Sequence, residues 1–122
     1  NLRCDRDLFS LVLQDGEAQI RNREGSLVTP GSGSGGILVI VGEMLENLTN
    51  GLYRSCLYRS TSSRMNRDKF ARLVVSFFAY PCPGTNLGPR NLCIQEVGEG
   101  RYPAVSSEDF LGSRLQELYA NF

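Results

Sequence analysis

The chain has 122 residues, of which 41% are hydrophobic and 21% are charged, and this length suits one domain with a buried core. Its 13 Lys and Arg residues balance its 13 Asp and Glu residues, so no overall field attracts nucleic acid or an acidic membrane. The chain contains no histidine, which excludes Ser-His-Asp and Cys-His nucleophile pairs and imidazole metal sites. An enzyme made from this sequence would have to work with carboxylates, thiols, phenols and arginines.

The first part of the chain predicts short strands separated by turns. Apolar residues alternate with polar ones, or form brief apolar runs bounded by glycine, over 8–14, 17–23, 26–29 and 37–41. The Gly/Ser-rich segment 30–36 precedes a strand and does not open a helix, so we interpret it as a connection and not as a phosphate-binding loop. Residues 43–48 could form about one helical turn.

The second part predicts two longer strands and a helix. Asn50-Gly51 turns the chain into a strand over 52–60, a polar loop follows over 61–68, and the strongest strand pattern covers 70–80. Ser106 can cap a helix whose apolar stripe contains Leu111, Leu115, Leu118 and Phe122. Six or seven short strands followed by one amphipathic helix indicate a mainly β sandwich or jelly roll with the helix packed outside.

Cysteine usage and the termini bear on where the protein resides. Cys4, Cys56, Cys82 and Cys93 form no C-x-x-C pair, so we expect reduced, mostly buried thiols and a cytoplasmic protein. The longest apolar run is far shorter than the ~20 residues of a membrane-spanning helix, and the first residues lack the apolar core of a signal peptide. Because residue 1 is not Met, we expect one domain, 1–122, excised from a longer chain.

Basic residues concentrate in one stretch despite the neutral total. Six lie within 54–72 against the single acidic Asp68, which could suit RNA or an acidic partner. A solvated loop with arginines paired inside the fold is the interpretation that we prefer. No aromatic RNA-binding signature accompanies the stretch, and we expect neither a nucleic-acid nor a membrane partner.

Six segments in succession resemble the C-terminal domain of the isopenicillin N synthase-like 2-oxoglutarate/Fe(II)-dependent dioxygenases. They are a strand that closes in Gln14-Asp15, a hairpin over 18–25, a strand with a Gly-Glu-Met-Leu end over 36–45, the Thr-Asn-Gly-Leu-Tyr-Arg-Ser segment 49–55, a strand over 72–81, and a helix start at 109–111. The resemblance implies a double-stranded β-helix, a form of jelly roll, with a C-terminal α-helix. The first core strand of that fold would lie upstream of residue 1.

The same resemblance implies where iron would be held, and there the sequence departs from the family. The family binds Fe(II) through a His-x-Asp pair and a distant His. The matching positions here are Arg3, Asp5 and Tyr58, so one ligand of three remains. A guanidinium at Arg3 is permanently charged, and it could pair with Asp5 and fill the site itself. We therefore expect no metal and no cofactor.

The co-substrate position is half retained. An Arg and a Ser two residues later clamp the distal carboxylate of 2-oxoglutarate in the family, and the matching residues here are Arg72 and Val74. An arginine alone can still hold a carboxylate, but a structural role for Arg72 is the interpretation that we favour.

These observations predict a catalytically inactive dioxygenase-like domain that serves as a protein-interaction or structural module. Its partner would be another protein or the rest of its own chain. Two alternatives stay open at this point. Arg72 could bind a small carboxylate in a non-catalytic sensor, or ligands outside residues 1–122 could complete an active Fe(II)/2-oxoglutarate oxygenase.

Overall fold

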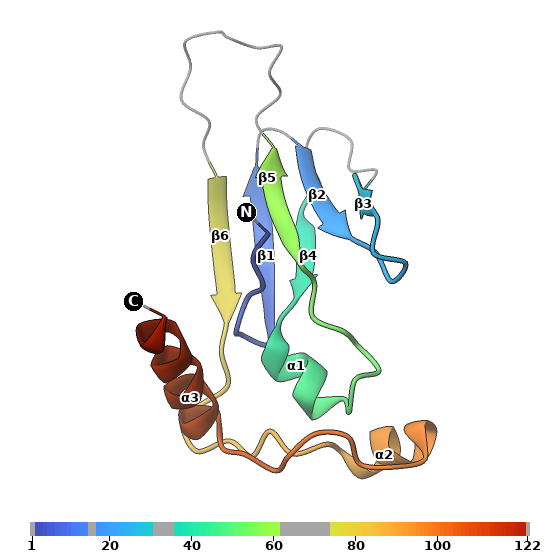
Figure 1. The fold of residues 1–122 in the computed structure, drawn as a ribbon, viewed down its shortest axis with the longest axis vertical. Coiled ribbons are helices and arrows are strands. Elements are labelled where there is room, and N and C mark those ends of the chain that lie inside the picture. Colours follow the sequence, from blue (N-terminus) through green and yellow to red (C-terminus); the bar gives the residue numbers. More distant parts are fainter. Residues whose placement is uncertain (1, 15–16, 31–35, 62–73, 122) are drawn as a thin grey trace, which may run out of the picture.

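Two three-stranded antiparallel sheets pack against each other in the computed structural model, which describes residues 2–14, 17–30, 36–61 and 74–121 (Figure 1). One sheet has the order β4-β1-β6, and its strands are β1 (Phe9–Gln14), β4 (Leu38–Val41) and β6 (Val74–Ala79). The other has the order β3-β2-β5, with β2 (Glu17–Arg21), β3 (Leu27–Val28) and β5 (Tyr58–Thr61). Because the chain crosses repeatedly from one sheet to the other, the strands form a jelly roll.

The strand register decides which side chains form the core between the sheets. Ser10 lies opposite Ile40, and Val12 lies opposite Leu38, so these residues share one face of the sheet. Val12 and Ile40 are buried on that face and form a cluster with Tyr58 from the other sheet. The inward face of one sheet therefore meets the first residue of β5 in the centre of the domain.

The opposite face of the β4-β1-β6 sheet is apolar and exposed. Leu11 lies between Val39 and Phe77 in the ladder, and Leu13 lies opposite Val75. Four side chains of this face are 48–62% exposed, and we call them the outer apolar face: Leu13, Val39, Val75 and Phe77. β6 is also an edge strand of its sheet. A three-strand patch of this kind is unusual on a soluble surface and typically marks an interaction site.

Three helices lie toward one end of the sheets: α1 (Glu43–Leu48), α2 (Asn91–Val97) and α3 (Ser107–Ala120) (Figure 1). A second core cluster joins Met44 of α1, Leu87 and Phe110 of α3. The N-terminus of α3 is capped as expected, since the Ser106 side chain accepts a hydrogen bond from the Asp109 amide over 3.2 Å. Within the described part of the chain, no helix is long and apolar enough to span a bilayer.

The prediction of a strand over 52–60 was wrong for most of its length. Asn50 and Gly51 do turn the chain, both with positive φ, but the chain joins a sheet only at Tyr58. Before that point Glu46 of α1 holds the segment, because its carboxylate accepts hydrogen bonds from the amide and hydroxyl of Ser55. Alternation of apolar residues over 52–57 therefore reflects a segment packed on α1 and not strand pairing.

The helical region also differs from the expectation. Helix α2 was not predicted, and it ends at Gly98, whose positive φ is the usual helix stop. The apolar stripe predicted for the last helix is buried only in part, since Leu111 packs against the second core cluster while Leu115 and Leu118 are 50% and 42% exposed. Phe122 lies outside the described residues. Ser107 and Phe110 are the buried residues of α3, because the N-terminal half of the helix makes its contacts with the domain.

The thiols are free, as predicted, but they are less buried than expected. Cys4, Cys56 and Cys93 are half-buried, and Cys82 is exposed. Of the loop predicted over 61–68, Thr61 is the last residue of β5 and the rest falls outside the described residues. Most of the glycine-rich segment 30–36 and the first part of the strand predicted over 70–80 also fall outside them. The rest of that prediction is confirmed as β6.

Gly42 controls how α1 meets the start of the first sheet. The amides of Gly42, Glu43 and Met44 donate to the carbonyl oxygens of Leu8, Asp5 and Asp7, so backbone groups of the chain's beginning satisfy the free amides of the helix start. This close approach requires glycine, because a Cβ at position 42 would collide with the carbonyl oxygen and the carboxylate of Asp7.

We expect Gly42→Ala to lower the free energy of unfolding by about 1–3 kcal/mol or more, since backbone atoms of Asp7 cannot move aside without breaking these hydrogen bonds. The matched control is Gly112→Ala in α3, where a Cβ meets nothing within 4 Å. The higher helix propensity of Ala should raise the free energy of unfolding of this variant by about 0.5–1 kcal/mol. Urea unfolding followed by circular dichroism measures both variants. Equal effects of the two substitutions would contradict this role of Gly42.

Candidate functional site

The three residues that the family resemblance places at metal-ligand positions lie together. Arg3 and Tyr58 form an antiparallel bridge in which each amide donates to the other residue's carbonyl oxygen over 2.9 Å. The Arg3 guanidinium carbon lies 4.9 Å from the centre of the Tyr58 ring, a distance suited to a cation–π contact. Asp5 follows two residues after Arg3 and turns its carboxylate toward the same tyrosine.

Tyr58 is the direct partner of Asp5. The buried Tyr58 hydroxyl lies 2.9 Å from both oxygens of the Asp5 carboxylate and donates its proton to them. Burial and the neighbouring Asp5 charge raise the pKa of Tyr58 to about 12. The phenol is therefore neutral at physiological pH and acts as a hydrogen-bond donor.

A second carboxylate extends this cluster. The Ser10 hydroxyl oxygen lies 2.5 Å from Asp5 Oδ2 and 2.8 Å from Asp7 Oδ2, although one hydroxyl carries only one proton to donate. Burial, and then the nearby Asp5 charge, raise the pKa of Asp7. A protonated Asp7 that donates to Ser10, which in turn donates to Asp5, satisfies both contacts.

The expected pairing of Arg3 with Asp5 is not what the structure contains. Their side chains form none of the ion pairs found among the described residues. Arg3 is mostly exposed and stacks on Tyr58, and the tyrosine hydroxyl takes the place beside the carboxylate. The backbone bridge explains this difference. It sets Arg3 directly opposite Tyr58, and the buried Tyr58 hydroxyl extends inward as far as Asp5.

This donor set does not fit Fe(II). A guanidinium has no lone pair to offer, the Tyr58 phenol holds its proton up to about pH 12, and both Asp5 oxygens already accept hydrogen bonds. Iron oxygenase sites use imidazole and carboxylate ligands. In the described ranges, no group of three or more His, Cys, Asp or Glu side chains is arranged to hold a metal ion.

The co-substrate positions are only partly visible. Arg72 lies outside the described residues, so the structural role that we favour and the alternative contact with a small carboxylate both stay predictions. Val74 is the first residue of β6. The pairing of β1 with β6 places it on the same inward face of the sheet as Val12. Its side chain is 45% exposed and offers no hydroxyl donor toward the interior.

Sequence reasoning missed Asp7 and Ser10. Both side chains are completely buried, and together they connect to Asp5. The spacing Asp5-Arg6-Asp7, directly before a strand, was the available signal. It places two carboxylates on the same side of the chain, but burial of one of them depends on the approach of α1.

The fold and the arrangement around Tyr58 and Asp5 define a class of domain: a mainly β jelly roll of the double-stranded β-helix kind, with a polar cluster between its sheets. No family model matches the chain. Individual relatives do match. Azadirone synthase LFS of Melia azedarach is 27% identical over 97% of this chain, and the 2-oxoglutarate-Fe(II) type oxidoreductase ppzC of Metarhizium majus is 28% identical over 92%.

Solved structures agree with this fold. A 2OG-Fe(II) oxygenase family protein of Caulobacter crescentus superposes with a TM-score of 0.86 over 97% of this chain and 40% of its own, at 22% identity. The dioxygenase for auxin oxidation of rice gives a TM-score of 0.78 over 95% of this chain and 40% of its own, at 16% identity.

The chain belongs to the 2-oxoglutarate/Fe(II) oxygenase family. It spans about a third of the length of its curated relatives, namely 36% of the Melia protein and 29% of the Metarhizium protein.

The raised pKa of Asp7 predicts a dependence of stability on pH. The pKa of Asp7 is 3.8 in an unfolded chain and higher in the fold, so the folded state binds this proton more tightly. The contribution of Asp7 to the free energy of unfolding is therefore full below 3.8 and is lost as the pH rises through the folded pKa. In Asp7→Asn the amide keeps a donor toward Ser10 and has no proton to lose.

We expect Asp7→Asn to gain stability relative to the unsubstituted protein as the pH rises from about 4 to about 7. Urea unfolding at several pH values measures the difference. Exposed Glu108→Gln, which also removes one carboxylate, is the control. A difference between Asp7→Asn and the unsubstituted protein that stays constant with pH would show that folding does not raise the pKa of Asp7.

Proposed function

We propose that residues 1–122 form a catalytically inactive member of the oxygenase family that serves as a structural or protein-interaction module. The observation that carries the proposal is the arrangement of Arg3, Asp5 and Tyr58. In this arrangement the one retained carboxylate has a phenol as its partner in place of a metal ion. Removal of Tyr58 from this position would leave the half-buried Asp5 carboxylate without its phenol donor, which costs stability.

The exposed surface supports the second half of the proposal. The outer apolar face carries no charged side chain, and β6 presents an edge in an apolar, uncharged strand, Val-Val-Ser-Phe-Phe-Ala. Such an edge pairs readily with another strand. We assign its cover to a further part of the protein's own polypeptide, because the relatives extend to about three times the length matched here.

The proposal predicts that metal leaves the protein unchanged and that two substitutions create a site. Mn(II) with N-oxalylglycine should leave the melting temperature of the unsubstituted protein unmoved. Arg3→His with Tyr58→His places two imidazoles beside Asp5 in the His-x-Asp and distant His pattern. This double variant should be stabilised by Mn(II), by about 2.7 kcal/mol when the metal is at about 100 times its Kd.

The matched control is Arg101→His with Tyr53→His, which adds the same two imidazoles at exposed positions. Stabilisation of the unsubstituted protein by Mn(II) would overturn the inactive assignment and favour an oxygenase. No effect of metal on the Arg3/Tyr58 double variant would show that these positions are not those of the family's ligands. Saturable heat with 2-oxoglutarate that disappears in Arg72→Ala would favour the carboxylate sensor.

If a further segment of the polypeptide covers the outer apolar face, amide exchange should differ between the longer polypeptide and residues 1–122 alone. In the longest natural polypeptide that contains this sequence, the amides of β6 should exchange more slowly than in residues 1–122 alone, because a further segment pairs with or covers the strand. Hydrogen exchange with mass spectrometry measures both. Equal exchange would contradict the assignment, and a dimer of residues 1–122 by light scattering would assign the face to a second copy.

A further inference from the structure

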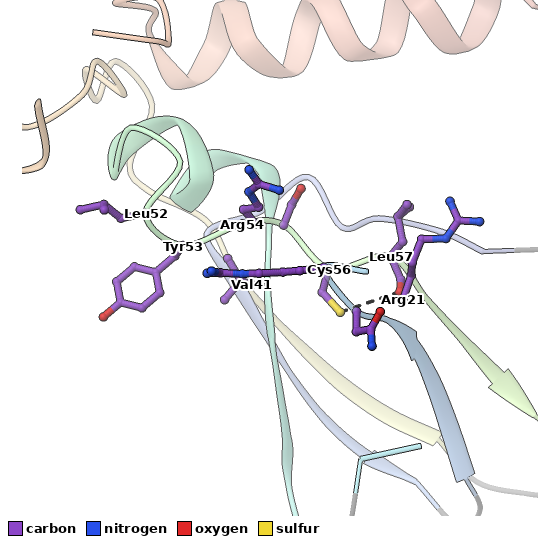
Figure 2. A pocket seen from close by; sticks show the side chains of 10 residues that line it. Arg21, Val41, Leu52, Tyr53, Arg54, Cys56 and Leu57 are labelled. Carbon is purple, nitrogen blue, oxygen red and sulfur yellow. Dashed lines mark hydrogen bonds between the residues drawn. The ribbon is translucent and has the colours of Figure 1, made fainter. Parts of the chain in front are cut away.

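A pocket of about 460 Å³ lies where β2 ends and the segment 52–57 passes beside Val41 (Figure 2). In the close view, Leu52 and Tyr53 lie on one side of it and Arg21 and Leu57 on the other, with Arg54 between them (Figure 2). The pocket shares no residue with the Arg3–Asp5–Tyr58 cluster. Its volume is within the range of small-molecule sites.

The lining of this pocket is strongly cationic. Arg21 and Arg23 come from the end of β2 and the turn after it, and Arg54 comes from the segment after α1. No acidic residue lines the pocket. None of the three arginines takes part in the ion pairs found among the described residues. Three arginines thus line one hollow in a chain whose total charge is zero.

The uncharged polar groups add hydrogen-bond donors. The Asn22 side-chain oxygen accepts from the amides of Glu24 and Ser26 over 3.1 and 2.9 Å, so its NH₂ group is what remains for a ligand. The Ser55 hydroxyl is committed as a donor to Glu46. The Tyr53 side chain is 61% exposed, and its ring and hydroxyl are open to a molecule in the pocket.

Apolar side chains form the remaining wall. Val41, Leu52 and Leu57 line the pocket together with the half-buried Cys56. The amide of Cys56 donates to the carbonyl oxygen of Val41, and the amide of Arg21 donates to that of Leu57. These backbone bonds tie the walls to one another, so the pocket is formed before a ligand arrives.

We propose that this pocket binds a small organic anion, a carboxylate or a phosphate monoester attached to a compact apolar body. Guanidinium groups recognise both anions through paired, charge-assisted hydrogen bonds, and the apolar wall accepts the body of the ligand. The site goes beyond the module function proposed above and does not depend on it, since an inactive domain and an active one could each carry it.

The test is a titration of residues 1–122 with phenyl phosphate and with benzoate, followed by two-dimensional NMR. Saturable shifts should centre on the amides of 21–23 and 52–57. Comparing the two probes shows which anion the site prefers, and benzyl alcohol, which lacks the charge, should bind much more weakly. Arg21→Gln with Arg54→Gln should weaken binding of the preferred anion by about tenfold or more, because charge-assisted hydrogen bonds are lost.

The matched control is Arg101→Gln, which removes an exposed arginine outside the pocket and should change the affinity by less than about twofold. Retained NMR dispersion verifies that each variant is folded. Absence of saturable shifts at millimolar phenyl phosphate and benzoate would overturn the proposal. Equal loss of affinity in Arg101→Gln would also overturn it, because binding would then depend on the total charge of the protein. Unchanged affinity in the Arg21/Arg54 double variant would overturn it as well, because the pocket arginines would then not hold the anion.

Discussion

The hydrogen bonds from the Tyr58 hydroxyl to the Asp5 carboxylate are the contact on which the centre of the domain depends. Asp5 lies just before β1, and Tyr58 is the first residue of β5, so these bonds join the two sheets. A carboxylate in such a position needs donors. Tyr58 and Ser10 supply them, and the close approach of Gly42 to Asp7 holds the start of the chain in place.

The same contact links structure to function. The family resemblance matches Asp5 with a carboxylate that would face a metal ion and two imidazoles, whereas Asp5 here faces a phenol whose pKa is about 12. The polar centre therefore stabilises the domain and offers no open coordination position. The two surfaces that we propose for binding are on the outside, at the outer apolar face and the arginine-lined pocket. These two surfaces have opposite chemistry and would suit different occupants.

The strands of the fold were largely predictable because their signal is local. Alternation and glycine breaks located the strands up to Val41, and Ser106 marked the start of α3. Prediction failed where contacts distant in sequence decide the conformation. Glu46 holds Ser55 away from the sheet. Leu115 and Leu118 stay exposed because α3 meets the second core cluster only as far as Leu111. Neither fact is encoded in the periodicity of its own segment.

The sequence by itself determined that histidine is absent, that the strands follow the oxygenase order, and that Arg3, Asp5 and Tyr58 are the residues to compare with metal ligands. Only the tertiary structure decided which hydrogen bonds these residues form with one another. Tyr58, and not Arg3, became the partner of Asp5, and Asp7 with Ser10 joined the cluster. The physical reason is that hydrogen-bond partners and burial depend on which segments the fold brings within about 3 Å, and composition carries no such distances.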